Sequence, residues 1–173
     1  MSDRHGRTNP DTRDRGRSMV KGTPRRGLGD LMEQTLDKTL TFPSTLEDAL
    51  KAEHQVLAEV SSRGYDDDAC FAIRLALDEA ISNAIQHGNR NDASKKVTVR
   101  VTVDADRVKI EVADEGGGFS PACVPDPTAP ENLEKPNGRG IMLINAYMTE
   151  VAFNDVGNRI TMIKRRGCTL PVR

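Results

Sequence analysis

The stretch from Ile73 to Asn89 is the sequence feature that most constrains the fold of this chain. Its apolar residues recur three and four positions apart, a spacing that gathers them on one face of a helix and does not fit a strand. They are Ile73, Leu77, Ala80, Ile81, Ala84 and Ile85. We therefore predict an amphipathic helix that turns this face to a core and ends near Gly88.

Two polar residues of this helix are notable for their spacing. Glu79 and Asn83 are four residues apart, so their side chains project side by side. A carboxylate and an amide oxygen in this arrangement can converge on one ligand. Exposed Glu and Asn are also typical of an ordinary solvated helix face, so the pair alone does not establish a site.

Length and composition predict one domain with a sizeable core, because the 173 residues are 36% hydrophobic. The 25 basic and 26 acidic residues give a net charge of -1, which provides no overall field toward nucleic acid or an acidic membrane. Aromatic residues make up 3% of the chain, so few side chains are available to stack on bases. We expect neither direct nucleic-acid binding nor membrane binding.

The compartment is indicated by the absence of apolar segments and by the cysteines. No apolar run is long enough to cross a bilayer, and the N-terminus is charged where a secretory signal carries its apolar segment. Cys70, Cys123 and Cys168 are far apart and form no CxxC pair, which favours reduced structural thiols over zinc or redox chemistry. We expect a cytoplasmic protein.

The ends of the chain differ from its middle. Residues 1–34 are rich in Arg, Asp, Gly and Thr and have no apolar period, which predicts a disordered polar tail. A solubilising extension is favoured over a docking arm for the arginines of this tail. We predict one ordered domain over residues 35–168 and a short C-terminal tail at 169–173.

The first elements of the domain follow from apolar spacing and capping signals. Alternation over residues 37–42 predicts a short strand that Pro43 stops. Ser44 and Glu47 form a capping-box pattern at the start of a helix that Gly64 ends. The helix containing Glu79 comes next.

The second half of the domain is predicted to be mainly strands. Apolar and polar residues alternate over 97–103 and 108–112, which predicts an antiparallel hairpin. A short helix over 141–147 precedes a last hairpin made of 151–153 and 160–163. Strands in sequential antiparallel pairs with segregated helices predict an α+β fold, a two-layer sandwich in which helices cover one face of a mixed sheet.

The strand predicted over residues 108–112 leads into a motif with the chemistry of a binding site. Asp114 is followed by Gly116 and Gly118, so a carboxylate acceptor lies next to backbone without side chains. Such a site suits a flat ligand edge that carries an amine donor. An ordinary glycine-rich turn after a strand is the alternative.

A second glycine motif follows a long loop. Five prolines lie between Phe119 and Asn137, and loops of this length within a compact domain are usually functional or disordered. Gly138, Arg139 and Gly140 then open a helix, whose free N–H groups favour phosphate. Neither a Walker lysine pattern nor a dinucleotide-binding GxGxxG is present.

Taken together, these motifs resemble a known superfamily. Glu79-x-x-x-Asn83, Asp114-x-Gly-x-Gly and Gly138-x-Gly140, in this order, resemble the N, G1 and G2 boxes of the GHKL ATPases. The stretches LALDEAISNAIQHGN and DEGGGF are most similar to the anti-sigma factor serine kinases. The resemblance covers about residues 37–166 and implies a Bergerat ATP-binding fold with the proline-rich segment as ATP lid.

The resemblance also implies roles for the motif residues. Asn83 would ligate Mg²⁺, Glu79 would act as base toward the attacking hydroxyl, and Asp114 would bind the adenine of ATP. The remaining nucleotide-binding residues would be Gly116, Gly118, Gly138, Arg139 and Gly140. Mg²⁺ prefers oxygen ligands and keeps several waters, so one protein amide oxygen plus phosphates suffices.

The function implied is an ATP-dependent serine kinase that phosphorylates an anti-anti-sigma protein and sequesters a sigma factor, with a homodimer as one assembly it allows. The alternative is an ATP-binding regulatory module without phosphotransfer, and Glu79 favours the enzyme because binding alone needs no base. A histidine kinase is disfavoured, since no helix pair with a phosphoacceptor precedes the domain and His87 is better read as a helix-end residue. Gly157-Asn158 replaces the Gly-Thr that the family often has before its final strand.

Overall fold

The computed structural model describes residues 35–118 and 139–168, which form a five-stranded sheet, three α-helices and a π-helical turn. The strands are β1 (Leu36–Pro43), β2 (Lys96–Val103), β3 (Arg107–Asp114), β4 (Glu150–Phe153) and β5 (Arg159–Arg165). The helices are α2 (Leu46–Ser62), α3 (Asp67–Asn83), the π-helix η1 (Ala84–Gly88) and α4 (Arg139–Tyr147).

The strands pair in the order β1-β2-β3-β5-β4, and each neighbouring pair is antiparallel. The mixed sheet expected from the sequence is therefore corrected to an antiparallel one. The reason lies in the connection from β1 to β2, which contains two helices that run in opposite directions. An even number of helices returns the chain to the end of the sheet where β1 stopped, so β2 runs back alongside β1.

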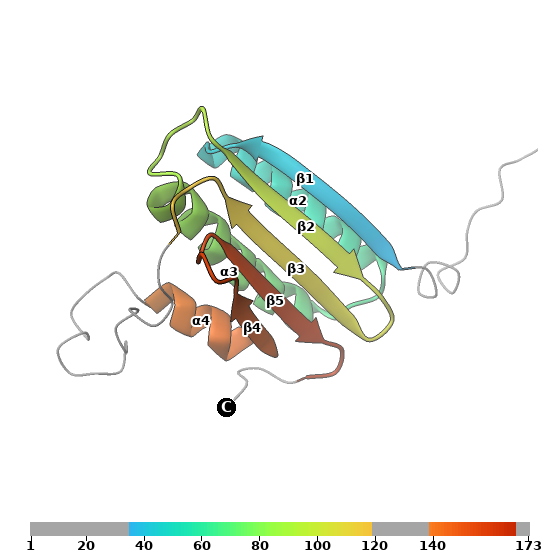
Figure 1. Cartoon of the computed structure of the whole chain (residues 1–173). Helices are drawn as coiled ribbons and strands as arrows, with labels where there is room; N and C mark the ends of the chain where they lie inside the picture. The colour runs from blue at the N-terminus through green and yellow to red at the C-terminus, as the bar shows by residue number, and fades with distance from the viewer. Residues whose placement is uncertain (1–34, 119–138, 169–173) are drawn as a thin grey trace, which may run out of the picture.

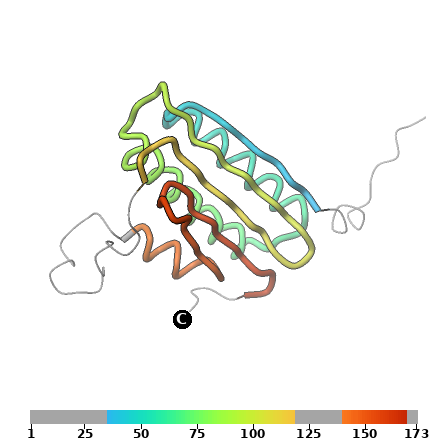
Figure 2. The backbone as a smooth tube through the Cα atoms, in the orientation of Figure 1, coloured from blue at the N-terminus to red at the C-terminus, as the bar shows by residue number. Residues whose placement is uncertain are grey.

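All three α-helices cover the same face of the sheet, with α3 between α2 and α4 (Figure 1). The backbone trace shows the same two layers (Figure 2). This arrangement confirms the predicted α+β sandwich. The core lies between the layers, and β2 shows why: its four valines are fully buried while the residues between them face solvent or are half-buried. They are Val97, Val99, Val101 and Val103.

The N-terminus of α2 begins one residue later than the capping pattern predicted. Thr45 is the N-cap, and its hydroxyl accepts a hydrogen bond from the backbone N–H of Asp48 at 3.2 Å. Ser44 is instead buried, and its hydroxyl donates to the carbonyl of Lys95 at 3.1 Å. The expected capping box of Ser44 with Glu47 was therefore wrong, because tertiary contacts hold the Ser44 hydroxyl elsewhere.

The helix expected to run to Gly88 changes geometry before its end. Its last turn is the π-helix η1, after which the backbone N–H of Asn89 donates to the carbonyl of Ala84 at 2.8 Å. Arg90 and Asn91 then adopt positive φ angles of 58°. Single π-turns within helices are often found at functional sites, and this one lies between Asn83 and the loop that leads to β2.

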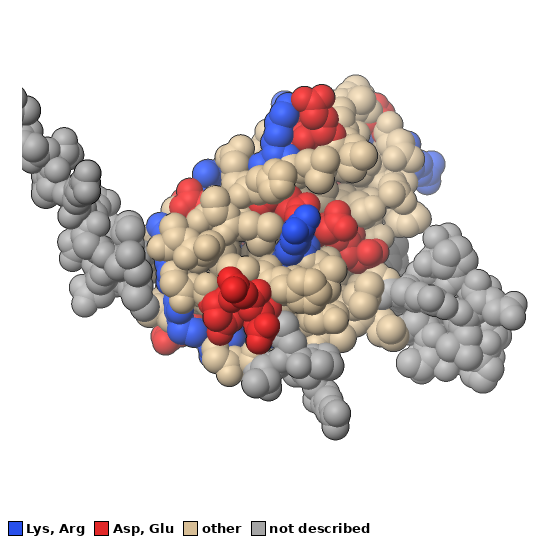
Figure 3. Space-filling view, turned by 180° about the vertical axis from the view of Figure 1, so that it is seen from behind, with Lys and Arg blue, Asp and Glu red and all other residues tan. Residues whose placement is uncertain are grey.

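On the helix-covered side of the molecule, acidic and basic side chains are interspersed with uncharged ones (Figure 3). Within the two described ranges, no helix is both long enough and apolar enough to span a bilayer. The predicted tails at 1–34 and 169–173 and the proline-rich segment fall outside the described residues, as does Cys123. Cys70 and Cys168 are free thiols.

Candidate functional site

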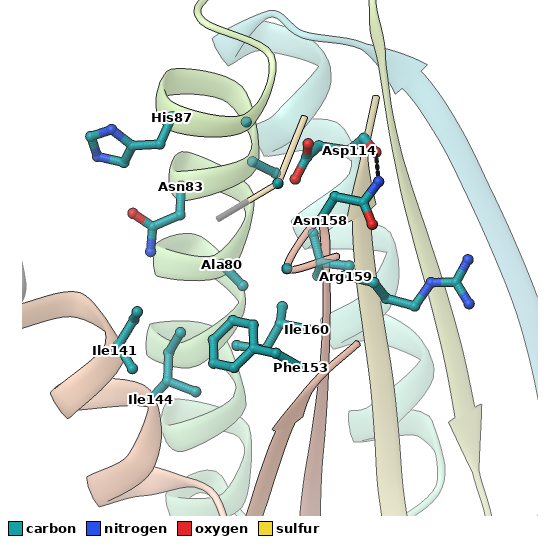
Figure 4. A pocket seen from close by; sticks show the side chains of 15 residues that line it. Ala80, Asn83, His87, Asp114, Ile141, Ile144, Phe153, Asn158, Arg159 and Ile160 are labelled. Carbon is teal, nitrogen blue, oxygen red and sulfur yellow. Dashed lines mark hydrogen bonds between the residues drawn. The ribbon is translucent and has the colours of Figure 1, made fainter. Parts of the chain in front are cut away.

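A pocket of about 310 Å³ lies between the end of α3, η1 and α4 on one side and the ends of β3 and β5 on the other (Figure 4). Its walls are mainly apolar, and its polar side chains come from separate elements. Apolar lining residues are Ala80, Ala84, Val112, Ile141, Ile144, Phe153 and Ile160; polar ones are Asn83, His87, Asp114, Asn158 and Arg159. Binding sites of small molecules commonly have this character.

Asp114, the last residue of β3, points its carboxylate into this pocket (Figure 4). Its Oδ1 accepts a hydrogen bond from the backbone N–H of Gly116 at 2.7 Å. Within the described residues, its Oδ2 accepts no hydrogen bond and is left for a ligand. Burial raises the pKa of Asp114 above its usual value of 3.8, and the Gly116 bond and the charge of Lys95 oppose this shift.

Two glycines make room for this carboxylate. A Cβ at Gly88 would collide with the carboxyl group of Asp114, and one at Gly116 would collide with the carbonyl of Gly88. The end of η1 and the turn after β3 therefore touch backbone to backbone. Gly88 was not among the site residues predicted from the sequence, because its partner lies 26 positions further along the chain and only the fold joins them.

Gly118 lies at the far end of the same turn and lines the pocket. Its φ is +74°, and a Cβ at this position would meet the carbonyl oxygen of Val156 in the β4–β5 turn. The turn after β3 thus contacts η1 through Gly116 and the β4–β5 turn through Gly118. A side chain at either position would force these segments apart.

Glu79 and Asn83 lie one turn apart on α3, as predicted, and their side chains touch. The Asn83 Nδ2 donates to Glu79 Oε1 at 3.3 Å. Because the carboxylate can only accept, this bond leaves the Asn83 Oδ1 as the amide atom that is free to bind a ligand in the pocket. Asn83 lines the pocket, whereas Glu79 is not among the residues that line it.

The Glu79 carboxylate lies instead against the first turn of α4. A Cβ at Gly140 would overlap the Glu79 side chain where it lies, so a side chain at this position would require the Glu79 carboxylate to move. Gly140 is buried. Arg139 begins α4, and its side chain lies outside the described part of the chain, as does Gly138.

Asn158 also lines the pocket, at the position where the family often has threonine. Its Oδ1 accepts from Asn154 Nδ2 at 2.8 Å, and its Nδ2 lies 3.4 Å from the carbonyl of Asp114. In Figure 4 this carboxamide is directed toward the Asp114 backbone. Asn154 in turn accepts from the backbone N–H groups of the turn, which fixes the shape of the β4–β5 connection.

His87 and Arg159 also line the pocket and were not predicted as site residues. His87 comes from η1 and Arg159 from the first position of β5, and both are exposed. His87 lies within the family-like stretch LALDEAISNAIQHGN but was interpreted as a helix-end residue, whereas no sequence signal pointed to Arg159.

The comparison with known proteins agrees with the fold and with the motifs. The family described as the histidine kinase-like ATPase domain matches residues 42–164. The chain is 33% identical over 118 residues to serine-protein kinase RsbW of Bacillus subtilis (strain 168), a match that covers 62% of this chain and 72% of that kinase. It is 28% identical over 127 residues to serine-protein kinase RsbW of Bacillus mycoides (strain KBAB4), covering 66% and 79%.

A solved structure gives the same result for the fold. The chain aligns with the RsbU and RsbW domains of Rv1364c from Mycobacterium tuberculosis with a TM-score of 0.54 and 17% identity, over 80% of this chain and 35% of that longer one. The family match spans most of the chain and contains each described residue of the ordered motifs. This chain is therefore a member of the histidine kinase-like (GHKL) ATPase family, among the anti-sigma factor serine kinases.

Proposed function

We propose that this protein is an ATP- and Mg²⁺-dependent serine kinase that phosphorylates an anti-anti-sigma protein and, in an alternative complex, sequesters a sigma factor. The observation that carries the proposal is the pocket that joins Asp114 to Asn83. One end offers a free carboxylate oxygen and the other a free amide oxygen, with Glu79 hydrogen-bonded beside the latter. The relatives named serine-protein kinase support the reaction.

The end of the pocket near Asp114 fits an adenine base. Gly88 and Gly116 leave the carboxylate without a covering side chain, and Val112 and Ile160 supply apolar walls. An exocyclic amine is a donor, so it matches the carboxylate oxygen that accepts no other hydrogen bond among the described residues. Asp114 would therefore hold the adenine amine, and Gly116 and Gly118 would let the ring approach the backbone.

The other end fits magnesium and phosphate. The orientation of Asn83 presents its Oδ1, an oxygen ligand of the kind that Mg²⁺ prefers. The described residues contain no group of three or more His, Cys, Asp or Glu placed to hold a metal, so waters and phosphate oxygens would supply the other ligands. When bound, Mg-ATP supplies the phosphoryl group and the metal charge that neutralises it. Gly138, Arg139 and Gly140 would hold phosphates at the start of α4.

Glu79 would act on the partner. We assign its carboxylate the role of accepting the proton of the serine hydroxyl that is phosphorylated, while Asn83 stays oriented beside it. The partner proteins, the possibility of a homodimer and the boundaries of the ATP-binding domain at 35–168 are parts of the same proposal.

A second candidate function is an ATP-binding regulatory module that holds a partner without transferring phosphate. It is favoured by one observation: the Glu79 carboxylate lies against Gly140 at the start of α4 and is not among the lining residues of the pocket. In this function Glu79 would serve to seat α4 on α3.

Glu79→Gln distinguishes the two functions. It keeps the size and hydrogen-bonding reach of the side chain and removes the base, so phosphotransfer from labelled ATP to a candidate anti-anti-sigma protein should fall by about 10²–10⁴-fold. ATP affinity, measured by calorimetry, should hardly change. Asp78→Asn is the matched control, because Asp78 is the exposed neighbour on the same helix and lies outside the pocket lining.

Full phosphotransfer activity in Glu79→Gln would show that Glu79 is not the base. Loss of ATP binding together with activity would assign Glu79 to the shape of the pocket. If the unaltered protein binds ATP but labels no partner, the regulatory module is the better description.

A further inference from the structure

Asn89 follows η1 and is fully buried, with a relative exposure of 0%. It does not line the pocket and belongs to none of the ordered motifs. A fully buried carboxamide needs hydrogen-bond partners for both its oxygen and its nitrogen. Those partners come from three separate parts of the chain, and one of them is the turn that directly follows Asp114.

The hydrogen bonds of Asn89 fix the orientation of its side chain. Oδ1 accepts from the backbone N–H of Glu115 at 2.9 Å. Nδ2 donates to the hydroxyl of Ser44 at 2.7 Å and to the carbonyl of Lys96 at 2.9 Å. Since a backbone N–H can only donate and a carbonyl can only accept, the reversed amide would lose both backbone partners at once.

The Glu115 N–H belongs to the peptide bond directly after Asp114. A hydrogen bond to it holds the plane of this peptide and so restricts the backbone direction at Asp114 and the path onward to Gly116. Gly116 in turn donates its N–H to Asp114 Oδ1 at 2.7 Å. Asn89 therefore influences the carboxylate through two successive steps, the Asp114–Glu115 peptide and the Gly116 N–H.

The residue before Asn89 acts on the same carboxylate from the other side. Gly88 lies against the Asp114 carboxyl group so closely that no Cβ would fit between them. Because Asn89 also bonds Ser44, between β1 and α2, and Lys96, the first residue of β2, the end of η1 is tied to the neighbouring elements. The contact of Gly88 with Asp114 depends on that anchoring.

We propose that Asn89 is a positioning residue for base recognition: it orients Asp114 so that the free carboxylate oxygen meets the exocyclic amine of adenine. This proposal rests on the proposed ATP site. Asn89 touches no nucleotide itself. Its removal should weaken recognition of the amine selectively and leave contacts to the rest of the nucleotide in place.

The test compares two nucleotides by calorimetry in the presence of Mg²⁺. One is ATP and the other is purine riboside 5′-triphosphate, which lacks the 6-amino group. The unaltered protein should prefer ATP by about 10-fold or more, because a hydrogen bond to a charged group is lost with the amine. In Asn89→Ala, we expect the preference to fall to about threefold or less, with the affinity for purine riboside triphosphate unchanged.

Ser44→Ala is the matched control. It removes one partner of the Asn89 nitrogen but leaves the bond from Glu115 to Oδ1 and the bond to Lys96 in place. It should keep the preference for ATP even where far-UV circular dichroism shows a lower melting temperature. Asn89→Ser, whose hydroxyl stops short of Glu115, is read in the same way as Asn89→Ala if the alanine variant does not fold.

A full preference for ATP in Asn89→Ala or Asn89→Ser would overturn the positioning role. Equal weakening of both nucleotides would also overturn it, since that pattern indicates general damage to the pocket. If the unaltered protein itself shows no preference for ATP, the assignment of Asp114 to the adenine amine is wrong. This failure of the proposed ATP site is distinguishable from a failure of the Asn89 role, which would be seen only in the variants.

Discussion

At the scale of single residues, Asp114 connects the stability of this protein to its proposed function. Its carboxylate is half-buried, one oxygen bonds Gly116, and burial raises its pKa. A carboxylate with a raised pKa is less stable charged in the fold than in the unfolded chain. The fold tolerates this cost at a position where a ligand can supply the missing donor, as active sites commonly do.

Asp114→Asn should weaken ATP binding by about 1.5–3 kcal/mol, because an amide replaces the charged acceptor of the adenine amine. Calorimetric titration with Mg-ATP measures this change. The Asn side chain can still accept from the Gly116 N–H, so the turn after β3 should keep its shape. Unchanged affinity would remove Asp114 from the base site.

The same variant should be more stable than the unaltered protein at pH 7. In the unaltered protein, the folded state binds more protons than the unfolded state between 3.8 and the raised pKa of Asp114, so stability falls as pH rises through that interval. Asp114→Asn lacks this dependence. Thermal melts followed by circular dichroism should show a higher melting temperature for Asp114→Asn than for the unaltered protein at pH 7. This difference should disappear below pH 3.8.

At the scale of elements, α4 is held at both ends by its neighbours. Its first turn lies against Glu79 of α3. At its C-terminal end, the carbonyl of Tyr147 accepts from Lys164 Nζ of β5 at 3.1 Å. Lys164 is fully buried, and its charge is favourable beside a helix C-terminus. Burial nevertheless lowers its pKa below the usual 10.5.

Lys164→Met should change the free energy of unfolding at pH 7 by less than about 1 kcal/mol, because removal of a buried charge offsets the lost hydrogen bond and Met fills a similar volume. The pKa of Lys164 in the folded state lies below 10.5, its usual value in an unfolded chain. Between these two pKa values the unfolded state binds more protons than the folded state, so the unaltered protein gains stability as pH rises toward 10.5. Lys164→Met lacks this gain, so its free energy of unfolding should become lower than that of the unaltered protein as pH rises.

Urea unfolding at several pH values checks this expectation. A loss of more than about 3 kcal/mol at pH 7 would mean that the bond from Lys164 to Tyr147 outweighs the cost of burying the charge. A constant difference between the two proteins from pH 7 to 10 would contradict the lowered pKa.

At the scale of the whole molecule, the described residues contain a five-stranded sheet, its helical cover and a buried core. Residues 1–34 add no periodic apolar face in sequence. Deletion of residues 1–34 should therefore leave the melting temperature and ATP affinity nearly unchanged. A large drop in melting temperature would show that this segment packs on the domain.

Local patterns in the sequence by themselves determine much of this fold. The alternation of valine with polar residues in β2 and the helical spacing in α3 depend on near neighbours in the chain, and both elements form where these patterns predict. The pairing of Glu79 with Asn83 is equally local, since residues four apart on a helix adjoin. Each motif is short and continuous, so it can be found in the sequence without the structure. The order of the motifs along the chain therefore also indicates the family.

Only the tertiary structure decided the contacts between distant segments. The strand order, the antiparallel pairing of β1 with β2, and the contact of Gly88 with Asp114 all depend on how the connections return the chain. Ser44 lost its expected capping role for the same reason, because Lys95 and Asn89 engage its hydroxyl. Asn89 carries no periodic signal; its partners are brought together only when four segments meet, and burial then requires each of its polar atoms to find one.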